Sequence, residues 1–212
     1  MNWCCRSSKI IIFLHGNAED LYGCAEMLKR LSNSFKAHAI GLEYPGYGIC
    51  FKEKVNAKII IQRSKRLYEF LTNDFGYNES DIIIFGRSLG SGAAIQIAAA
   101  YNPSLLVLMS PYTKIKKVAK DICCWTPWFL KERFNSISFI KNVNCKFFLI
   151  HGRDDKVIKC HHSEDIYEKA IQLGKEDLWD ITIRADMDHN NFVYKVDIID
   201  PIKNFIKSEQ LF

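Results

Sequence analysis

The chain has 212 residues, of which 48% are hydrophobic and 25% are charged. This size and composition predict a single globular domain over residues 1–212 and exclude a long disordered region. The formal net charge of +5 is mild, and no nucleic-acid-binding motif accompanies it, so nucleic acid is not an expected partner.

Neither a membrane span nor a secretory leader is predicted. The longest apolar stretches, such as residues 10–14, are too short to cross a bilayer, and no small-residue cleavage site follows them. We therefore expect a cytoplasmic protein. Peripheral membrane contact is an alternative, through S-acylation of Cys4 and Cys5 or through the lysine run at 114–120, although a solvated helix face is the commoner use of such a run.

The eight cysteines predict neither a zinc site nor a disulfide framework. They include two adjacent pairs but no C-x-x-C spacing, which argues against zinc. Without a secretory leader, reduced thiols are the expectation.

Short apolar runs alternate with stretches of helical periodicity along the chain. The apolar runs predict six strands, at residues 9–14, 37–42, 81–85, 105–109, 147–150 and 179–183. The stretches between them predict helices at residues 18–31, 57–75, 89–100, 161–173 and 192–207. Apolar strands separated by helices indicate an α/β protein with a mostly parallel sheet in a three-layer sandwich.

The segment at residues 110–144 interrupts this alternation. It is longer than an ordinary crossover, which predicts a small cap or lid over a site. Four aromatic residues in it would shield the site or hold an acyl chain, although core packing is the more frequent use of such residues: Trp125, Trp128, Phe129 and Phe134.

The strand predicted at 81–85 leads into Gly86-Arg87-Ser88-Leu89-Gly90 and then into a helix of small residues. A G-x-S-x-G turn between a strand and a helix is typical of a nucleophile elbow, which lifts the serine oxygen clear of the sheet on a strained turn. A dinucleotide-binding G-x-G-x-x-G does not fit, because its last glycine is missing. Ser88 is therefore the predicted nucleophile.

The first predicted strand ends at His15-Gly16-Asn17-Ala18. A tight turn here can aim backbone N–H groups at a developing oxyanion, and the N–H of Leu89 beside the nucleophile would be the second donor. The alternative is a structural turn in which Asn17 caps a helix.

Two further strand ends supply an acid and a base. Asp154 and Asp155 follow the strand at 147–150, and either could orient a histidine or serve as a turn residue. His189 follows the last strand and completes the chain order serine, aspartate, histidine, so it is the predicted general base. His161 and His162 open the helix after the acid loop, where we expect them to face solvent or to cap.

On these residues the chain resembles the α/β-hydrolase domain-containing 17 subfamily, whose members are protein depalmitoylases. The resemblance runs from about Ile10 to the C-terminus and rests on the Ser88 turn together with five segments: residues 15–20, 43–48, 110–113, 151–158 and 189–190.

The resemblance implies an α/β-hydrolase fold with Ser88 as nucleophile, His189 as base and Asp155, rather than Asp154, as acid. It also implies oxyanion donors at the backbone of Asn17 and Leu89. Relatives begin with two further strands, so we expect a sheet that lacks the first two strands and exposes the edge at residues 37–42.

These residues predict a serine hydrolase that cleaves acyl esters or thioesters without a metal or an organic cofactor. An S-acylated protein as substrate is implied by the resemblance alone. The alternatives are a small-ester or lipid esterase, a related peptidase, or an inactive protein of the same fold that serves as a binding module or scaffold.

Overall fold

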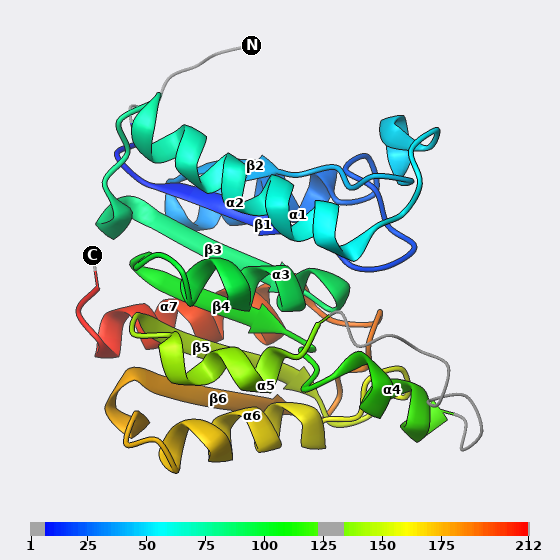
Figure 1. The fold of residues 1–212 in the computed structure, drawn as a ribbon. Coiled ribbons are helices and arrows are strands. Elements are labelled where there is room, and N and C mark those ends of the chain that lie inside the picture. Colours follow the sequence, from blue (N-terminus) through cyan, green and yellow to red (C-terminus); the bar gives the residue numbers. More distant parts are fainter. Residues whose placement is uncertain (1–6, 123–133, 212) are drawn as a thin grey trace.

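A computed structural model describes residues 7–122 and 134–211. Six parallel strands form one sheet in the order β2-β1-β3-β4-β5-β6 (Figure 1). Every strand lies within two residues of its predicted bounds: β1 (Ile10–Leu14), β2 (His38–Gly41), β3 (Ile82–Arg87), β4 (Leu105–Met109), β5 (Lys146–Gly152) and β6 (Trp179–Arg184).

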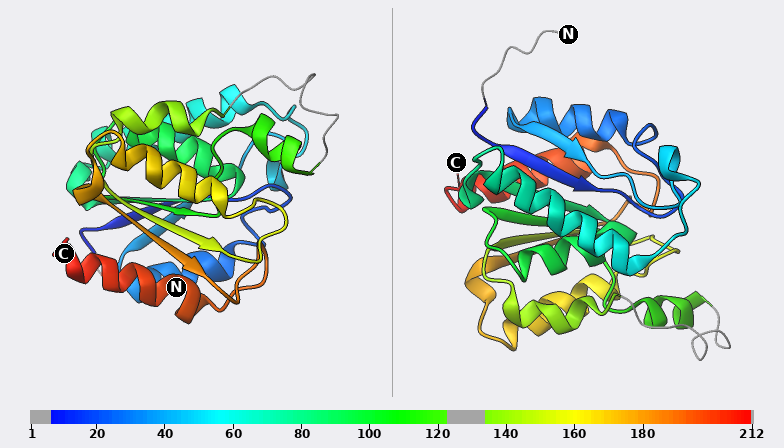
Figure 2. Two further views of the ribbon diagram at one scale, coloured as in Figure 1. Left: turned by 90° about the horizontal axis from the view of Figure 1, so that it is seen from below. Right: turned by 45° about the horizontal axis from the view of Figure 1, so that its top comes forward.

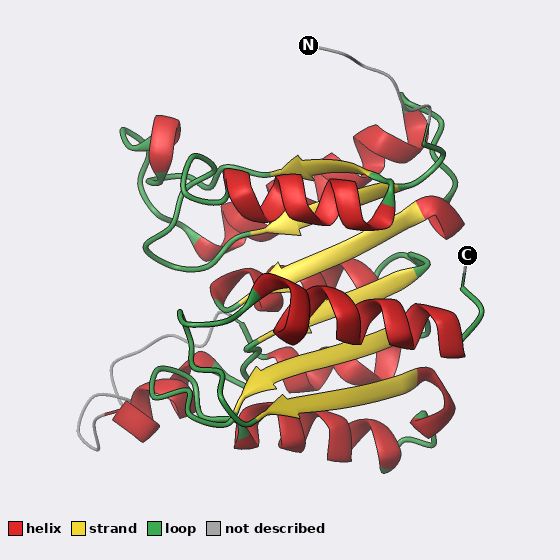
Figure 3. Cartoon of the chain, turned by 180° about the vertical axis from the view of Figure 1, so that it is seen from behind, coloured by secondary structure: helices red, strands yellow, loops and turns green. Residues whose placement is uncertain are grey.

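Helices cover both faces of the sheet, which is why the strands are apolar on both sides. Four helices lie on one face (Figure 1): α2 (Ala57–Asn73), α3 (Leu89–Ala98), α5 (Ser136–Phe139) and α6 (His161–Ile171). The view from behind shows the two helices of the other face, α1 (Ala25–Phe35) and α7 (Asp200–Ser208) (Figure 3). The predicted three-layer α/β architecture is confirmed.

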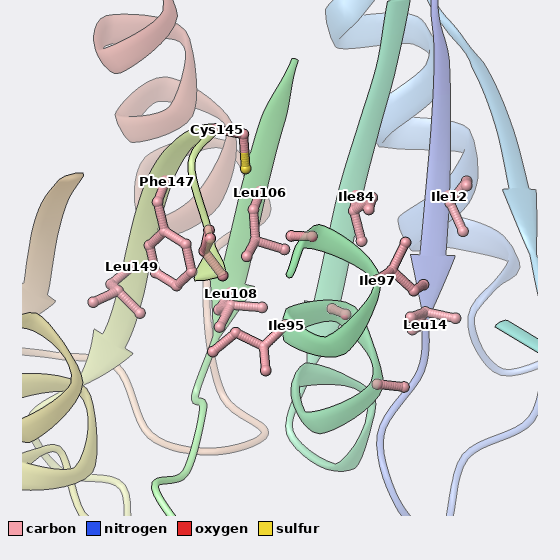
Figure 4. Close-up of a cluster of buried hydrophobic side chains, with 14 of the residues drawn as sticks. Ile12, Leu14, Ile84, Ile95, Ile97, Leu106, Leu108, Cys145, Phe147 and Leu149 are labelled. Carbon is pink, nitrogen blue, oxygen red and sulfur yellow. The ribbon is translucent and has the colours of Figure 1, made fainter. Parts of the chain in front are cut away.

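The core divides at the sheet, because successive residues of a strand point to opposite faces. In β1, Ile12 and Leu14 pack toward α3, whereas Ile11 and Phe13 pack toward α1. Figure 4 shows the first of these clusters, in which side chains of α3 lie against β1, β3, β4 and β5. Helix α3 therefore sits at the centre of the fold, directly after Ser88.

Strand β2 is an edge strand. It pairs with β1 in register from Ile10↔His38 to Phe13↔Gly41, and no described strand pairs with its other side. This is the edge that the resemblance led us to expect. Its four residues limit the length of unpaired backbone that it presents.

The helix predicted at residues 18–31 is wrong over its first seven residues, since α1 begins at Ala25. Ala18 has a φ of 58°, in the left-handed region that ends helical backbone. The Glu19 carboxylate accepts a hydrogen bond of 2.7 Å from the Gly16 N–H, which holds this stretch as a loop. Helices α2, α3 and α6 begin where predicted and each end two residues earlier.

The last predicted helix, at residues 192–207, consists of two elements. Residues Tyr194–Ile199 form a wider π-helix, η6, and α7 follows it. The Asp197 carboxylate accepts hydrogen bonds from the Val193 N–H at 2.7 Å and from Arg184 Nε at 3.0 Å, so it ties this segment to the end of β6. Among the described residues outside the segment at 110–144, three short 3-10 helices occur: η1 (Gly48–Cys50), η2 (Glu79–Asp81) and η5 (Glu176–Leu178).

The segment at residues 110–144 contains α4 (Ile115–Ile122), α5 and the short helix η4 (Ile140–Asn142). Helix α4 projects from the body of the molecule near the carboxyl ends of the strands (Figure 2). Three of the four aromatic residues, Trp125, Trp128 and Phe129, lie outside the described residues, so the cap stays a prediction. Phe134 is buried beside Tyr112 and against Gly92 of α3, which places it in the core.

Gly90 has no room for a side chain. A Cβ there would overlap the carbonyl oxygen of Leu14 at the end of β1. We expect Gly90→Ala to lower the free energy of unfolding by about 3 kcal/mol, the upper range for overpacking, as measured by urea denaturation. Gly23→Ala is the control, because its Cβ would meet nothing closer than 3.5 Å. Equal stability of the two variants would contradict the tight packing at Gly90.

Candidate active site

Ser88 lies on a strained turn between β3 and α3. Its φ of 48° and ψ of −116° fall outside the regions that side-chain-bearing residues normally adopt, at a cost of about 1–3 kcal/mol. Two hydrogen bonds hold the turn: the Ser88 N–H donates to the Met109 carbonyl at 2.9 Å, and Ser91 Oγ donates to the Ser88 carbonyl at 2.6 Å. The surrounding structure therefore imposes this conformation.

Both glycines of the turn are required by packing. A Cβ at Gly86 would lie 2.6 Å from the Ala94 Cβ, and one at Gly90 would overlap the backbone of Leu14. Because α3 packs this closely on β3 and on the end of β1, the G-x-S-x-G spacing is a steric condition for the turn.

The structure brings the three predicted side chains together at the carboxyl ends of β3, β5 and β6. His189 Nε2 lies 3.0 Å from Ser88 Oγ, and His189 Nδ1 lies 2.7 Å from Asp155 Oδ2. With Nδ1–H donating to the carboxylate, Nε2 is free to accept the serine proton. Each of the three residues is buried, with at most 9% of its surface exposed. Asp154, the other candidate acid, is exposed.

The Asp155 carboxylate is held from several sides. Its Oδ1 accepts hydrogen bonds from the N–H groups of Val157 at 2.9 Å and Ile158 at 2.8 Å, and His151 Nε2 lies 3.3 Å from Oδ2. Burial by itself raises the pKa of Asp155, but hydrogen bonds from His151, His189 and the Ile158 N–H outweigh it and hold the pKa well below its usual value. Asp155 is therefore ionised at neutral pH.

The two predicted oxyanion donors are the first N–H of α3 and the N–H of Asn17 in the turn after β1, and α3 packs against the end of β1 at Gly90. The N–H of Leu89 is the first of α3 and has no partner within the helix. No described residue accepts a hydrogen bond from it or from the Asn17 N–H. The Asn17 side chain accepts a hydrogen bond of 2.5 Å from the Tyr47 hydroxyl. Asn17 does not cap a helix, because α1 begins at Ala25.

Arg87, which precedes the serine, links the loops on both sides of the site. Its Nη2 donates to the His189 carbonyl at 2.8 Å and to Asn190 Oδ1 at 2.9 Å. Its Nη1 forms an ion pair with Glu19, whose other carboxylate oxygen accepts the Gly16 N–H. Burial lowers the pKa of Arg87, yet a guanidinium stays charged at neutral pH. Arg87 thus fixes the histidine loop relative to the Asn17 turn.

Sequence reasoning missed Arg87 and Glu19. Arg87 stands at the first variable position of G-x-S-x-G, and the motif predicts no role for that position. An arginine two residues after the apolar run 82–85 was the available signal, because a cation at the end of a buried strand needs an anionic partner.

The expectation that His162 faces solvent or caps a helix is wrong. His162 is fully buried rather than solvent-facing, and its Nδ1 lies 2.9 Å from Thr113 Oγ1, so the start of α6 turns this side chain toward α4 and the loop before it. Burial, together with the neighbouring His161, lowers the pKa of His162 to about 4, and the imidazole is neutral at pH 7. His161 is partly exposed.

A hollow lies against His189. Its volume is ≈ 380 Å³, and its lining is mainly polar: Asp154, Lys156, Asp188, Asn190 and Asn191, with Val157. Asp188 is engaged in its own turn, since its carboxylate accepts hydrogen bonds from the N–H groups of Asn190 and Asn191. A polar group of a bound molecule would fit this hollow better than a hydrocarbon chain.

Within the described part of the chain, no helix has both the length and the apolar character needed to cross a bilayer. No protein-family model matches the chain. It is 30% identical over 191 residues to a protein of Acanthamoeba polyphaga mimivirus described as an α/β hydrolase, covering 90% of this chain and 70% of that protein.

The chain is also 27% identical over 207 residues to α/β hydrolase domain-containing protein 17B of Xenopus laevis, covering 97% of this chain and 69% of the relative. Across these and a further relative from Caenorhabditis elegans, the chain spans 58–70% of the relatives' length. Among solved structures, an esterase of Pyrococcus furiosus superposes with a TM-score of 0.80 at 17% identity, over 96% of this chain and 82% of the esterase.

We expect Arg87 and Glu19 to stabilise the fold through their interaction with each other, because Arg87 is buried. In a double-mutant cycle with Arg87→Met and Glu19→Gln, we expect a coupling free energy of about 1–3 kcal/mol in urea denaturation. The exposed pair Arg66–Glu69 is the control and should give about 0.5 kcal/mol or less. Additive effects of the Arg87 and Glu19 substitutions would show that the pair does not join the two loops.

Proposed function

Because the chain belongs to the α/β-hydrolase family, we propose that it is a serine hydrolase that cleaves acyl esters or thioesters. The observation that carries the proposal is the hydrogen-bonded series from Asp155 through His189 to Ser88, with separations of 2.7 and 3.0 Å. Side chains in this order can activate a serine hydroxyl as a nucleophile.

In the proposed reaction, Ser88 Oγ attacks the acyl carbonyl carbon while His189 Nε2 takes the serine proton. The ionised Asp155 stabilises the imidazolium that forms. The carbonyl oxygen becomes an oxyanion, which the N–H groups of Leu89 and Asn17 bind. His189 then protonates the leaving group, and the acyl group stays on Ser88 as an ester. His189 next activates a water molecule, which releases the acid and restores the serine.

Among such substrates we propose S-acylated proteins. The leaving group departs on the side of His189, because His189 protonates it. The polar hollow beside His189 supports a polar leaving group such as a cysteine within a peptide. The resemblance to a subfamily of protein depalmitoylases points in the same direction. A small-ester or lipid esterase, a peptidase and an inactive scaffold are the alternatives that the following experiments separate.

A fluorophosphonate probe should label the wild-type chain, because it reacts with a serine that a neighbouring base has activated. Ser88→Ala should abolish labelling. Ser91→Ala removes one of the two hydrogen bonds that hold the Ser88 turn and should weaken labelling without abolishing it, because the nucleophile remains. Labelling would be read by in-gel fluorescence, with circular dichroism to verify folding. A folded wild-type chain that the probe does not label would favour the scaffold.

The two adjacent aspartates give a matched pair of variants. Asp155→Asn should lower kcat about 10⁴-fold, because an amide favours the wrong histidine tautomer. Asp154→Asn should change kcat little, because Asp154 is exposed.

Turnover would be measured on p-nitrophenyl esters and acyl thioesters of increasing chain length. Loss of activity in Asp154→Asn alone would reassign the acid. A sharp preference for acetate over longer acyl chains would count against a long-chain S-acylated protein as the substrate.

A further inference from the structure

Two imidazoles and one carboxylate converge between α4 and α6, outside the Ser88 group. Asp121 lies on the last turn of α4, and His161 and His162 are the first two residues of α6. Asp121 Oδ2 is 3.1 Å from His162 Nε2 and 3.2 Å from His161 Nε2. One ligand atom from each of the three residues lies within 4.8 Å of the others.

Two atoms of this cluster are buried without a hydrogen-bond partner. They are His162 Nε2, on a fully buried side chain, and Asp121 Oδ2. The two atoms are close enough for a hydrogen bond, but their orientation does not produce one. A buried polar atom without a partner costs about 1–3 kcal/mol. A single group that bonds to both atoms at once would remove this cost.

The distances from Asp121 Oδ2 to the two histidine Nε2 atoms are similar to the distances between ligand atoms around a bound metal ion. Zinc binds histidine nitrogen and carboxylate oxygen at about 2.0–2.2 Å in tetrahedral geometry, which places the ligand atoms about 3.2–3.6 Å apart. The two contacts of Asp121 Oδ2 lie at or just below this range. The rings of His161 and His162 are stacked, with centroids 4.5 Å apart and an interplanar angle of 25°, so the rings must also turn toward the ion to bind it.

Thr113 fixes the orientation of the His162 ring and turns Nε2 toward Asp121. His162 Nδ1 accepts a hydrogen bond of 3.3 Å from the Thr113 N–H and lies 2.9 Å from Thr113 Oγ1. For Nε2 to bind a metal, the proton would have to move to Nδ1, which would then donate to Thr113 Oγ1 instead of accepting the Thr113 N–H. The other charged groups nearby, Lys117 of α4 and Asp165 of α6, form an ion pair with each other. Their charges offset, so they oppose a cation at the cluster only weakly.

We propose that Asp121, His161 and His162 form a binding site for a divalent transition-metal ion, with zinc as the best match. Two neutral imidazoles and one carboxylate suit Zn²⁺ or Co²⁺, whereas Mg²⁺ and Ca²⁺ require a shell of oxygen ligands. Three protein ligands leave the fourth position to water. The ion would join α4 to α6 and so anchor one end of the segment predicted as a cap.

Co²⁺ provides the direct test on the full chain after treatment with a chelator. Tetrahedral Co²⁺ absorbs in the visible region, and a thiolate ligand adds a charge-transfer band in the near ultraviolet. We expect visible absorption that saturates at one ion per chain, no thiolate band, and displacement by Zn²⁺. Zn²⁺ should also raise the Tm, because it binds the folded state. None of these readouts depends on hydrolase activity, so they stand apart from the proposed function.

His161→Ala and Asp121→Asn change partly exposed positions, and we expect each to weaken Co²⁺ binding at least about 100-fold. His38→Ala on β2 is the control and should bind as the wild type does. Circular dichroism would verify that each variant is folded. The proposal is overturned if the wild type binds no Co²⁺, if both ligand variants bind it normally, or if the thiolate band shows that cysteines hold the ion.

Discussion

The close packing of the Ser88 turn against the end of β1 is the constraint on which the rest of the site depends. Gly86 and Gly90 have no Cβ, so α3 can approach β3 and the Leu14 carbonyl closely. This contact holds Ser88 in its strained conformation and brings the start of α3 against the carbonyl groups of Leu14 and His15, just before the Asn17 turn. The predicted nucleophile and oxyanion donors therefore follow from one packing arrangement.

The proposed acid, Asp155, and the proposed base, His189, are positioned by the neighbouring parallel pair β5 and β6. Gly152 lies against the Met187 backbone, where a Cβ would overlap the carbonyl oxygen, and this brings the loops after the two strands together. Arg87 then ties the histidine loop to Glu19. Four strand ends are thus linked through a few buried contacts, which is why residues distant in sequence hold separations near 3 Å.

Helix α6 connects this group with the proposed metal site. Ser163 Oγ lies 2.6 Å from His151 Nδ1, and His151 contacts Asp155. The preceding residue, His162, faces Asp121 and Thr113. A metal ion that fixes the start of α6 would therefore also steady the residues that support the acid. This connection joins α4, at one end of the predicted cap, to the site beneath it.

The sequence by itself determined the strands, the architecture and the Ser88 turn, because alternation of apolar runs and the chemistry of a tight turn are local properties. Chain order predicted His189 as the base, and the family resemblance favoured Asp155 over Asp154 as the acid. Only the tertiary structure decided the start of α1, the burial of His162 and the Arg87–Glu19 ion pair. Each of these depends on a contact between side chains that local periodicity does not describe, since only folding brings the partners together.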